Sequence, residues 1–143
     1  MTFGATTDVK AMTARILIVE DEMLVAMELE AILAERGLDP VGIAPDLSTA
    51  ADYFDQSLDL ALVDLNLRDG LTGPEIGKLL GAKGVTVLFL TANPGLLGDG
   101  IAGAVGVLTK PTDSDTVQQA VDYALGVRLG RAVEPPVALK LFG

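Results

Sequence analysis

The sequence predicts an α/β fold: a doubly wound, five-stranded parallel sheet with helices on both faces. Five short apolar runs alternate along the chain with stretches of helical periodicity. The runs are apolar throughout instead of alternating with polar residues, which is typical of strands whose two faces are both covered. Strands that alternate with helices pair in parallel through right-handed crossovers. The expected architecture is therefore a three-layer sandwich.

The first strand and the first helix are predicted within residues 15–37. The run RILIV at 15–19 is a short β-rich segment that ends abruptly at three acidic residues. A helix from Met23 to Arg36 follows, and Gly37 stands where a C′ glycine belongs. The positions that we expect to face the core recur at helical spacing; they are Val25, Leu29, Ile32 and Leu33.

The next segments predict two more strands with a helix between them. PVGIA at 40–44 is a short strand, and 47–56 is predicted as a helix capped near Asp46 or Ser48. The third strand lies in the apolar run LALVDLNL at 60–67, which a single acidic residue interrupts.

The second half of the chain supplies the remaining elements. Pro74 opens a helix that runs to about Leu80. VTVLFL at 85–90 is the most hydrophobic run, and VGVLT at 105–109 is the last strand. A final helix covers 113–128, and its apolar face is formed by Val117, Val121, Ala124 and Leu125.

Composition excludes several classes of function. The chain has no cysteine and no histidine, so thiolate or imidazole metal sites, disulfides and Ser–His or Cys–His catalysis are ruled out. The formal charge of −10 argues against direct nucleic-acid binding. No apolar stretch approaches the roughly 20 residues of a membrane span, and no signal-peptide pattern is present. We therefore expect a soluble, cytoplasmic protein whose metal chemistry uses oxygen ligands, which points to Mg²⁺, Ca²⁺ or Mn²⁺.

Polar side chains stand at the carboxyl ends of four predicted strands, where sites form in doubly wound sheets. Three carboxylates converging there repel each other and require a cation, and Mg²⁺ suits open oxygen ligands that share phosphate oxygens. A lysine and a hydroxyl supply what an incoming phosphoryl group needs. An ionised Asp64 beside the metal is a nucleophile that would give an aspartyl phosphate. The residues are Glu20, Asp21, Asp64, Thr91 and Lys110.

These residues stand in the segments RILIVEDE, ALVDLNL, LFLTAN and VLTKP, and with them the chain resembles the receiver domain of two-component response regulators. The resemblance covers 14–128 and implies a flavodoxin-like (CheY-like) sandwich. Residues 1–13 and 129–143 lie outside the pattern: we expect a flexible N-terminal arm and a C-terminal tail in which VALKLF can form a short extended segment. With no output domain after 128, the expectation is a stand-alone, single-domain response regulator.

The resemblance implies roles for the residues that handle phosphate. Asp64 would accept a phosphoryl group from a sensor histidine kinase or a phosphotransfer protein. Thr91 and Lys110 would hold the phosphoryl oxygens, and Ala92 would be the small residue that leaves room for the group. Such a chain is a phosphoprotein that promotes only its own phosphorylation and dephosphorylation, not an enzyme acting on another substrate.

The resemblance also implies a metal site. Asp21 and Asp64 would bind Mg²⁺ directly together with the backbone carbonyl of Asn66. Glu20 would act through a coordinated water.

Two departures from the family pattern affect how a signal leaves the site. The family usually has Tyr or Phe three residues before the lysine; here that position is Val107. The segment between Thr91 and Lys110 carries five glycines, which argues against a robust fourth helix. Because no aromatic ring is available to turn inward, we expect activation to order or displace residues 92–104.

The expected partners are a kinase and an unidentified downstream protein, with no nucleic acid and no membrane. The spacing places Met23, Met27 and Glu30 on the outer face of the first helix, and the methionines suit an adaptable kinase contact. Scattered surface apolar residues, however, need no functional explanation. The output would be protein–protein contact or service as a phosphate sink.

Three other classes of protein are alternatives to a phosphorylated receiver. A pseudo-receiver, a binding module with the fold but no phosphotransfer, is the alternative, although the intact site residues count against it. Haloacid-dehalogenase-like phosphatases carry a second Asp two residues after the nucleophile, where this chain has Asn66. A Rossmann module needs a glycine fingerprint after the first strand, where VEDE stands.

Overall fold

Parallel strands form the centre of the structure, a computed structural model in which residues 13–143 are described. The parallel strands are β1 (Arg15–Val19), β2 (Asp39–Ala44), β3 (Leu60–Val63), β4 (Thr86–Thr91) and β5 (Ala104–Thr109). Their order across the sheet is β2-β1-β3-β4-β5, and each neighbouring pair runs parallel. This order confirms the doubly wound sheet. The arm expected at 1–13 lies outside the described residues except for its last position.

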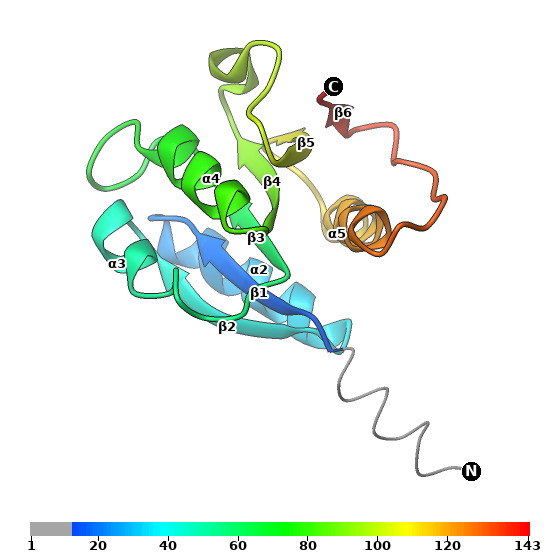
Figure 1. The fold of residues 1–143 in the computed structure, drawn as a ribbon, viewed down its shortest axis with the longest axis horizontal. Helices are drawn as coiled ribbons and strands as arrows, with labels where there is room; N and C mark the ends of the chain where they lie inside the picture. Colours follow the sequence, from blue (N-terminus) through cyan, green and yellow to red (C-terminus); the bar gives the residue numbers. More distant parts are fainter. Residues whose placement is uncertain (1–12) are drawn as a thin grey trace, which may run out of the picture.

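Helices cover both faces of the sheet (Figure 1). The helices α2 (Met23–Glu35) and α5 (Ser114–Arg128) pack on one face. The opposite face is covered by α3 (Leu47–Ala51) and α4 (Gly73–Ala82). Among residues 13–143, no helix is long and apolar enough to cross a membrane.

The first strand shows why the sheet is apolar on both sides. Ile16 and Ile18 join the core that lies under α2 and α5, whereas Leu17 and Val19 join the core under α3 and α4. All four side chains are almost completely buried. Each buried aliphatic side chain contributes about 1.5–3 kcal/mol, so a strand of this kind is stable only between two layers of helices.

Glycine and aspartate residues mark three helix ends at the positions that the sequence predicts. Gly37 has a φ of +76° directly after the C-cap of α2. Asp113 caps α5 by accepting a hydrogen bond from the Thr116 N–H at 2.7 Å. Asp46 caps α3 in the same way, with the Thr49 N–H at 2.8 Å.

The helix predicted over 47–56 is wrong in its length, because α3 ends at Ala51 and residues 52–55 form turns. The chain tightens to hydrogen bonds between residues three apart, as from the Tyr53 N–H to the Ala50 carbonyl at 2.9 Å. Tyr53 and Phe54 then pack against the core under α3 and α4. Packing of these two aromatic rings therefore overrides the helical continuation that the sequence suggested.

The crossover from β4 to β5 contains the short 3₁₀ helix η1 (Pro94–Leu97) in place of an α-helix. Gly98, Gly100 and Gly103 follow with φ values of +54°, +122° and +88°. Residues with side chains rarely adopt such angles. The expectation that this glycine-rich segment lacks a robust helix is confirmed.

The C-terminal residues fold back onto the sheet. The short strand β6 (Lys140–Leu141) pairs antiparallel with β5 and becomes a sixth strand at that edge (Figure 1). The sequence suggested an extended segment here, but it did not indicate where the segment would lie.

Candidate functional site

Asp64 follows directly after β3 and is held by the backbone on both sides. Its N–H donates to the Val19 carbonyl at the end of β1, at 2.9 Å. Its Oδ1 accepts a hydrogen bond from the Leu65 N–H at 2.7 Å, and the side chain is buried. A Cβ at Gly73, the first residue of α4, would collide with the Asp64 carbonyl oxygen. Only glycine therefore lets α4 begin this close to the acidic residue.

The acidic run that follows β1 divides into buried and exposed members. The Glu20 N–H donates to the Ala44 carbonyl of β2 at 3.0 Å, and the Glu20 side chain is 2% exposed. Its Oε2 accepts a hydrogen bond from the Glu22 N–H at 3.2 Å. Asp21 is exposed and makes no side-chain hydrogen bond or ion pair with the residues that the structure describes. The two neighbouring acids therefore have different surroundings.

Lys110 joins the two strand ends. It follows β5, and its N–H donates to the Thr91 carbonyl at 2.9 Å. Its Nζ lies 2.6 Å from Glu20 Oε1 and 2.9 Å from Asp64 Oδ2. One ammonium thus bridges two buried carboxylates that are 44 positions apart in the chain.

Burial and the ion pairs shift the pKa values of Glu20 and Lys110 in opposite directions. Burial raises the pKa of Glu20, and the hydrogen bond from Lys110 only partly offsets this effect. For Lys110, burial disfavours the ammonium, but its hydrogen bonds to Glu20 and Asp64 outweigh burial and hold its pKa above the ordinary value. The site therefore keeps a charged lysine in place.

The three acidic side chains form one cluster. Carboxylate oxygens of Glu20, Asp21 and Asp64 lie within 4.8 Å of one another. One lysine cannot neutralise three carboxylates, so the cluster retains an excess of negative charge. Oxygen donors at this spacing, one of them exposed to solvent, fit a hard divalent cation such as Mg²⁺.

The other predicted site residues differ in how far they are exposed to solvent. Thr91 is the last residue of β4 and is buried, and its Oγ1 accepts a hydrogen bond from the Asn93 N–H at 3.1 Å. Ala92 and Asn66 are exposed on the loops that follow β4 and β3. Within residues 13–143, the Thr91 hydroxyl makes no hydrogen bond to the side chain of Asp64 or of Lys110.

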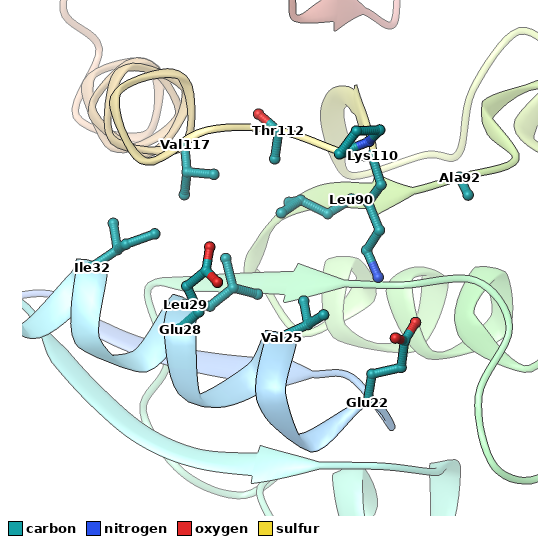
Figure 2. Close-up of a pocket in the computed structure, with 11 residues that line it drawn as sticks. Glu22, Val25, Glu28, Leu29, Ile32, Leu90, Ala92, Lys110, Thr112 and Val117 are labelled. Carbon is teal, nitrogen blue, oxygen red and sulfur yellow. The ribbon is translucent and has the colours of Figure 1, made fainter.

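A hollow of about 380 Å³ opens beside the cluster, between α2 and the connection from β5 to α5. Figure 2 shows Lys110 extending from this connection toward the start of α2, where Glu22 lies. Glu28 and Thr112 also line the hollow, and most of its remaining lining is apolar, including Val25, Leu29, Ile32, Leu90 and Val117. Glu22 was not among the site residues predicted from the sequence, although it stands in a run of three acidic residues.

The remaining predicted positions lie on α2 and β5. Met23 and Met27 are 56% and 53% exposed, which confirms that they face outward. Glu30, predicted on the same face, is half-buried. Val107 is completely buried in the core under α3 and α4.

Comparisons with known proteins agree with this geometry. Residues 16–122 match the family model of the response regulator receiver domain. The phyllosphere-induced regulator PhyR of Methylorubrum extorquens is 38% identical over 86 residues, which cover 58% of this chain and 32% of that protein. The transcriptional regulatory protein PdtaR of Mycobacterium tuberculosis is 32% identical over 127 residues, or 85% of this chain and 62% of that protein. The chain therefore spans less than two thirds of these curated relatives.

Solved structures show the same similarity. The receiver domain of PhyR from Erythrobacter litoralis is 31% identical, with a TM-score of 0.71, and the match covers 87% of this chain and 97% of that domain. The response regulator PhyR from Brucella abortus is 29% identical, with a TM-score of 0.73 over 82% of this chain and 50% of that one.

Proposed function

The chain belongs to the response regulator receiver domain family, and on this premise we propose that a histidine kinase or a phosphotransfer protein phosphorylates it on Asp64. A receiver domain is a phosphoacceptor signalling module rather than an enzyme. The observation that carries the proposal is the Lys110 bridge: the ammonium lies 2.9 Å from Asp64 Oδ2, beside a cluster of three carboxylates. A lysine in this position meets the negative charge of an arriving phosphoryl group.

The transfer needs one nucleophile and two hydrogen-bond donors. An Asp64 carboxylate oxygen attacks phosphorus, and the bond between phosphorus and the donor imidazole breaks. The electron pair of that bond stays on the imidazole nitrogen, which takes up a proton. The Lys110 ammonium and the Thr91 hydroxyl hold the phosphoryl oxygens, since Thr91 accepts from Asn93 and keeps its own hydrogen for donation. Ala92, with its small side chain, leaves room for the group.

We propose Mg²⁺ as the cation of the acidic cluster, with Asp21, Asp64 and the backbone carbonyl of Asn66 as direct ligands. Glu20 acts through a water. The different surroundings of the two acids support this division, because Glu20 is already bonded to Lys110 and Glu22 whereas Asp21 is exposed. When bound, Mg²⁺ supplies the positive charge that lets three carboxylates and a phosphoryl group share one site.

The exposed face of α2 is the proposed docking surface for the kinase. The kinase docks on the outer face of α2, where Met23 and Met27 are exposed. Flexible methionines suit contact with a variable partner. The output is contact with a downstream protein or service as a phosphate sink, and the shift of residues 92–104 expected from the sequence carries the signal away from Thr91.

Beryllofluoride, a mimic of the phosphoryl group, tests the proposal. With Mg²⁺ present, the wild-type protein should give the ¹⁹F resonances of a bound trifluoroberyllate, and Asp64→Asn should give none. Asp55→Asn, which removes an exposed carboxylate outside the acidic cluster, is the matched control and should behave as wild type. A wild-type protein that binds no beryllofluoride would be a pseudo-receiver.

A further inference from the structure

The C-terminal residues 139–142, named the strap below, hold the β5 edge from both faces of the sheet. Leu139 is buried in the core under α2 and α5. Phe142, three residues later, packs into the opposite core, under α3 and α4. The strap therefore crosses the sheet edge and anchors one apolar side chain in each of the two cores.

Two glycines, one in β5 and one in the crossover before it, leave room for the strap. A Cβ at Gly106 of β5 would collide with the Lys140 carbonyl oxygen. A Cβ at Gly100 would lie 2.6 Å from the Phe142 ring. Either substitution would push the strap away from the edge, so both positions need the absence of a side chain.

Phe142 contacts the segments on both sides of Thr91. Its ring centroid lies 6.5 Å from that of Phe89, which precedes Thr91 by two residues in β4. Its ring also packs on Gly100, in the segment that follows Thr91. An aromatic ring is thus present in the same core as the buried Val107, although it comes from the C-terminal residues.

The strap is held by few bonds. Its strand pairing joins only Gly106 with Leu141 and Val107 with Lys140. The Phe142 N–H donates to the Val105 carbonyl at 3.0 Å, and Lys140 and Leu141 are exposed. A short edge segment with so little pairing opens at low free energy, so a small movement near Thr91 can displace it.

We propose that the strap is a displaceable cover of the β5 edge, and that phosphorylation of Asp64 unseats Phe142 and uncovers this edge strand. The inference rests on the proposed function, because the signal begins at Asp64. Movement of Thr91 toward a phosphoryl group shifts the two segments that hold Phe142. The strap then leaves, and the β5 edge offers unpaired N–H and C=O groups that bind an extended segment of a partner protein.

Amide hydrogen exchange of the full chain, measured by NMR with Mg²⁺ and with or without beryllofluoride, tests the proposal. We expect protection of the Phe142 amide to fall when beryllofluoride binds, and Asp64→Asn to show no change. If the ¹⁹F resonances show bound beryllofluoride and the Phe142 amide keeps its protection, the strap is a fixed part of the fold and the proposal is overturned, while the phosphoacceptor function stands. If no beryllofluoride binds, the proposed function fails and the strap proposal fails with it.

Linkage supplies a second test. If phosphorylation favours release of the strap, then release of the strap must stabilise the phosphorylated state, and the two equilibrium constants change by the same factor. Phe142→Ala should therefore tighten beryllofluoride binding by about fivefold or more, the lower range of measured couplings. Val137→Ala is the matched control, because Val137 lies in the same tail and is fully exposed. A Phe142→Ala protein with the affinity of this control, or a weaker one, would contradict the coupling.

Discussion

The Nζ of Lys110 lies 2.9 Å from Oδ2 of Asp64, so the proposed phosphoacceptor is already paired with the proposed phosphate-binding lysine. The same Nζ lies 2.6 Å from the buried Glu20. Before any phosphoryl group arrives, the Lys110 ammonium offsets the free-energy cost of burying these two carboxylates. The bridge therefore serves the stability of the fold as well as the proposed chemistry.

Removing this cation should destabilise the protein in a way that Mg²⁺ reverses. Lys110→Met leaves Glu20 and Asp64 without their shared donor, at a cost of about 1–3 kcal/mol. Urea unfolding with and without MgCl₂ measures the effect, and Mg²⁺ should recover most of the loss because it neutralises the same carboxylates. Lys78→Met, at an exposed lysine of α4, is the control and should change little. An equal loss with and without Mg²⁺ would contradict this compensation of the lost ammonium by the metal.

The two neighbouring acids should rank in opposite orders for fold stability and for metal binding. Without Mg²⁺, Glu20→Gln should lower the melting temperature more than Asp21→Asn, because Glu20 is buried and bonded to Lys110. The rise in melting temperature on adding Mg²⁺ should instead be smaller for Asp21→Asn, the loss of the direct ligand. Thermal scans of both variants over a series of MgCl₂ concentrations measure the two rankings. If both variants lose the same share of the Mg²⁺ response, the assignment of Asp21 as the direct ligand is wrong.

Kinase docking on α2 is testable with charge substitutions. Met23→Lys combined with Met27→Lys should slow phosphotransfer from the cognate kinase by about tenfold or more, the factor that corresponds to 1.4 kcal/mol of contact free energy. Phosphorylation by acetyl phosphate should be unchanged, since the site itself is intact. Val127→Lys combined with Leu129→Lys, at exposed positions near the end of α5, is the control. Transfer at the wild-type rate would mean that the kinase docks elsewhere.

The cap of α3 should make the fold sensitive to acid. The Arg68 guanidinium, 2.5 Å from the Asp46 carboxylate, lowers the pKa of Asp46 to about 2, below its ordinary value of 3.8. The folded state therefore binds this proton less readily than the unfolded state does. The stabilisation is fully present above pH 3.8 and is lost as the pH falls toward 2. In urea unfolding, the stability difference between wild type and Asp46→Asn should shrink over this interval, and a constant difference would contradict the assignment.

Residues at strand ends made most of the fold and the site predictable. The wholly apolar run at 16–19 has few stable positions other than a sheet covered on both faces. Polar residues placed directly after such runs must then meet at one edge of the sheet, as Glu20, Asp64 and Lys110 do. Periodicity and topology are enough to bring these groups together.

The parts that the sequence did not predict depend on tertiary packing. The end of α3 at Ala51 follows from where Tyr53 and Phe54 find a core to pack against. The position of the strap likewise depends on Phe142 reaching Phe89, a contact across 53 positions of the chain that no local pattern encodes. The complete fold determines which distant apolar side chains contact each other, and local patterns in a single sequence do not predict these contacts.

Intact-protein mass spectrometry after incubation with acetyl phosphate and Mg²⁺ tests most directly whether Asp64 is the phosphoacceptor. The wild-type protein should gain the mass of one phosphoryl group, and peptide mapping should place that group on Asp64. Asp64→Asn should gain none while remaining folded, because the amide retains the shape of the site but is not a nucleophile toward phosphorus. A phosphoryl group that persists on Asp64→Asn, or a wild-type protein that gains no mass while its Mg²⁺ binding is intact, would contradict the account.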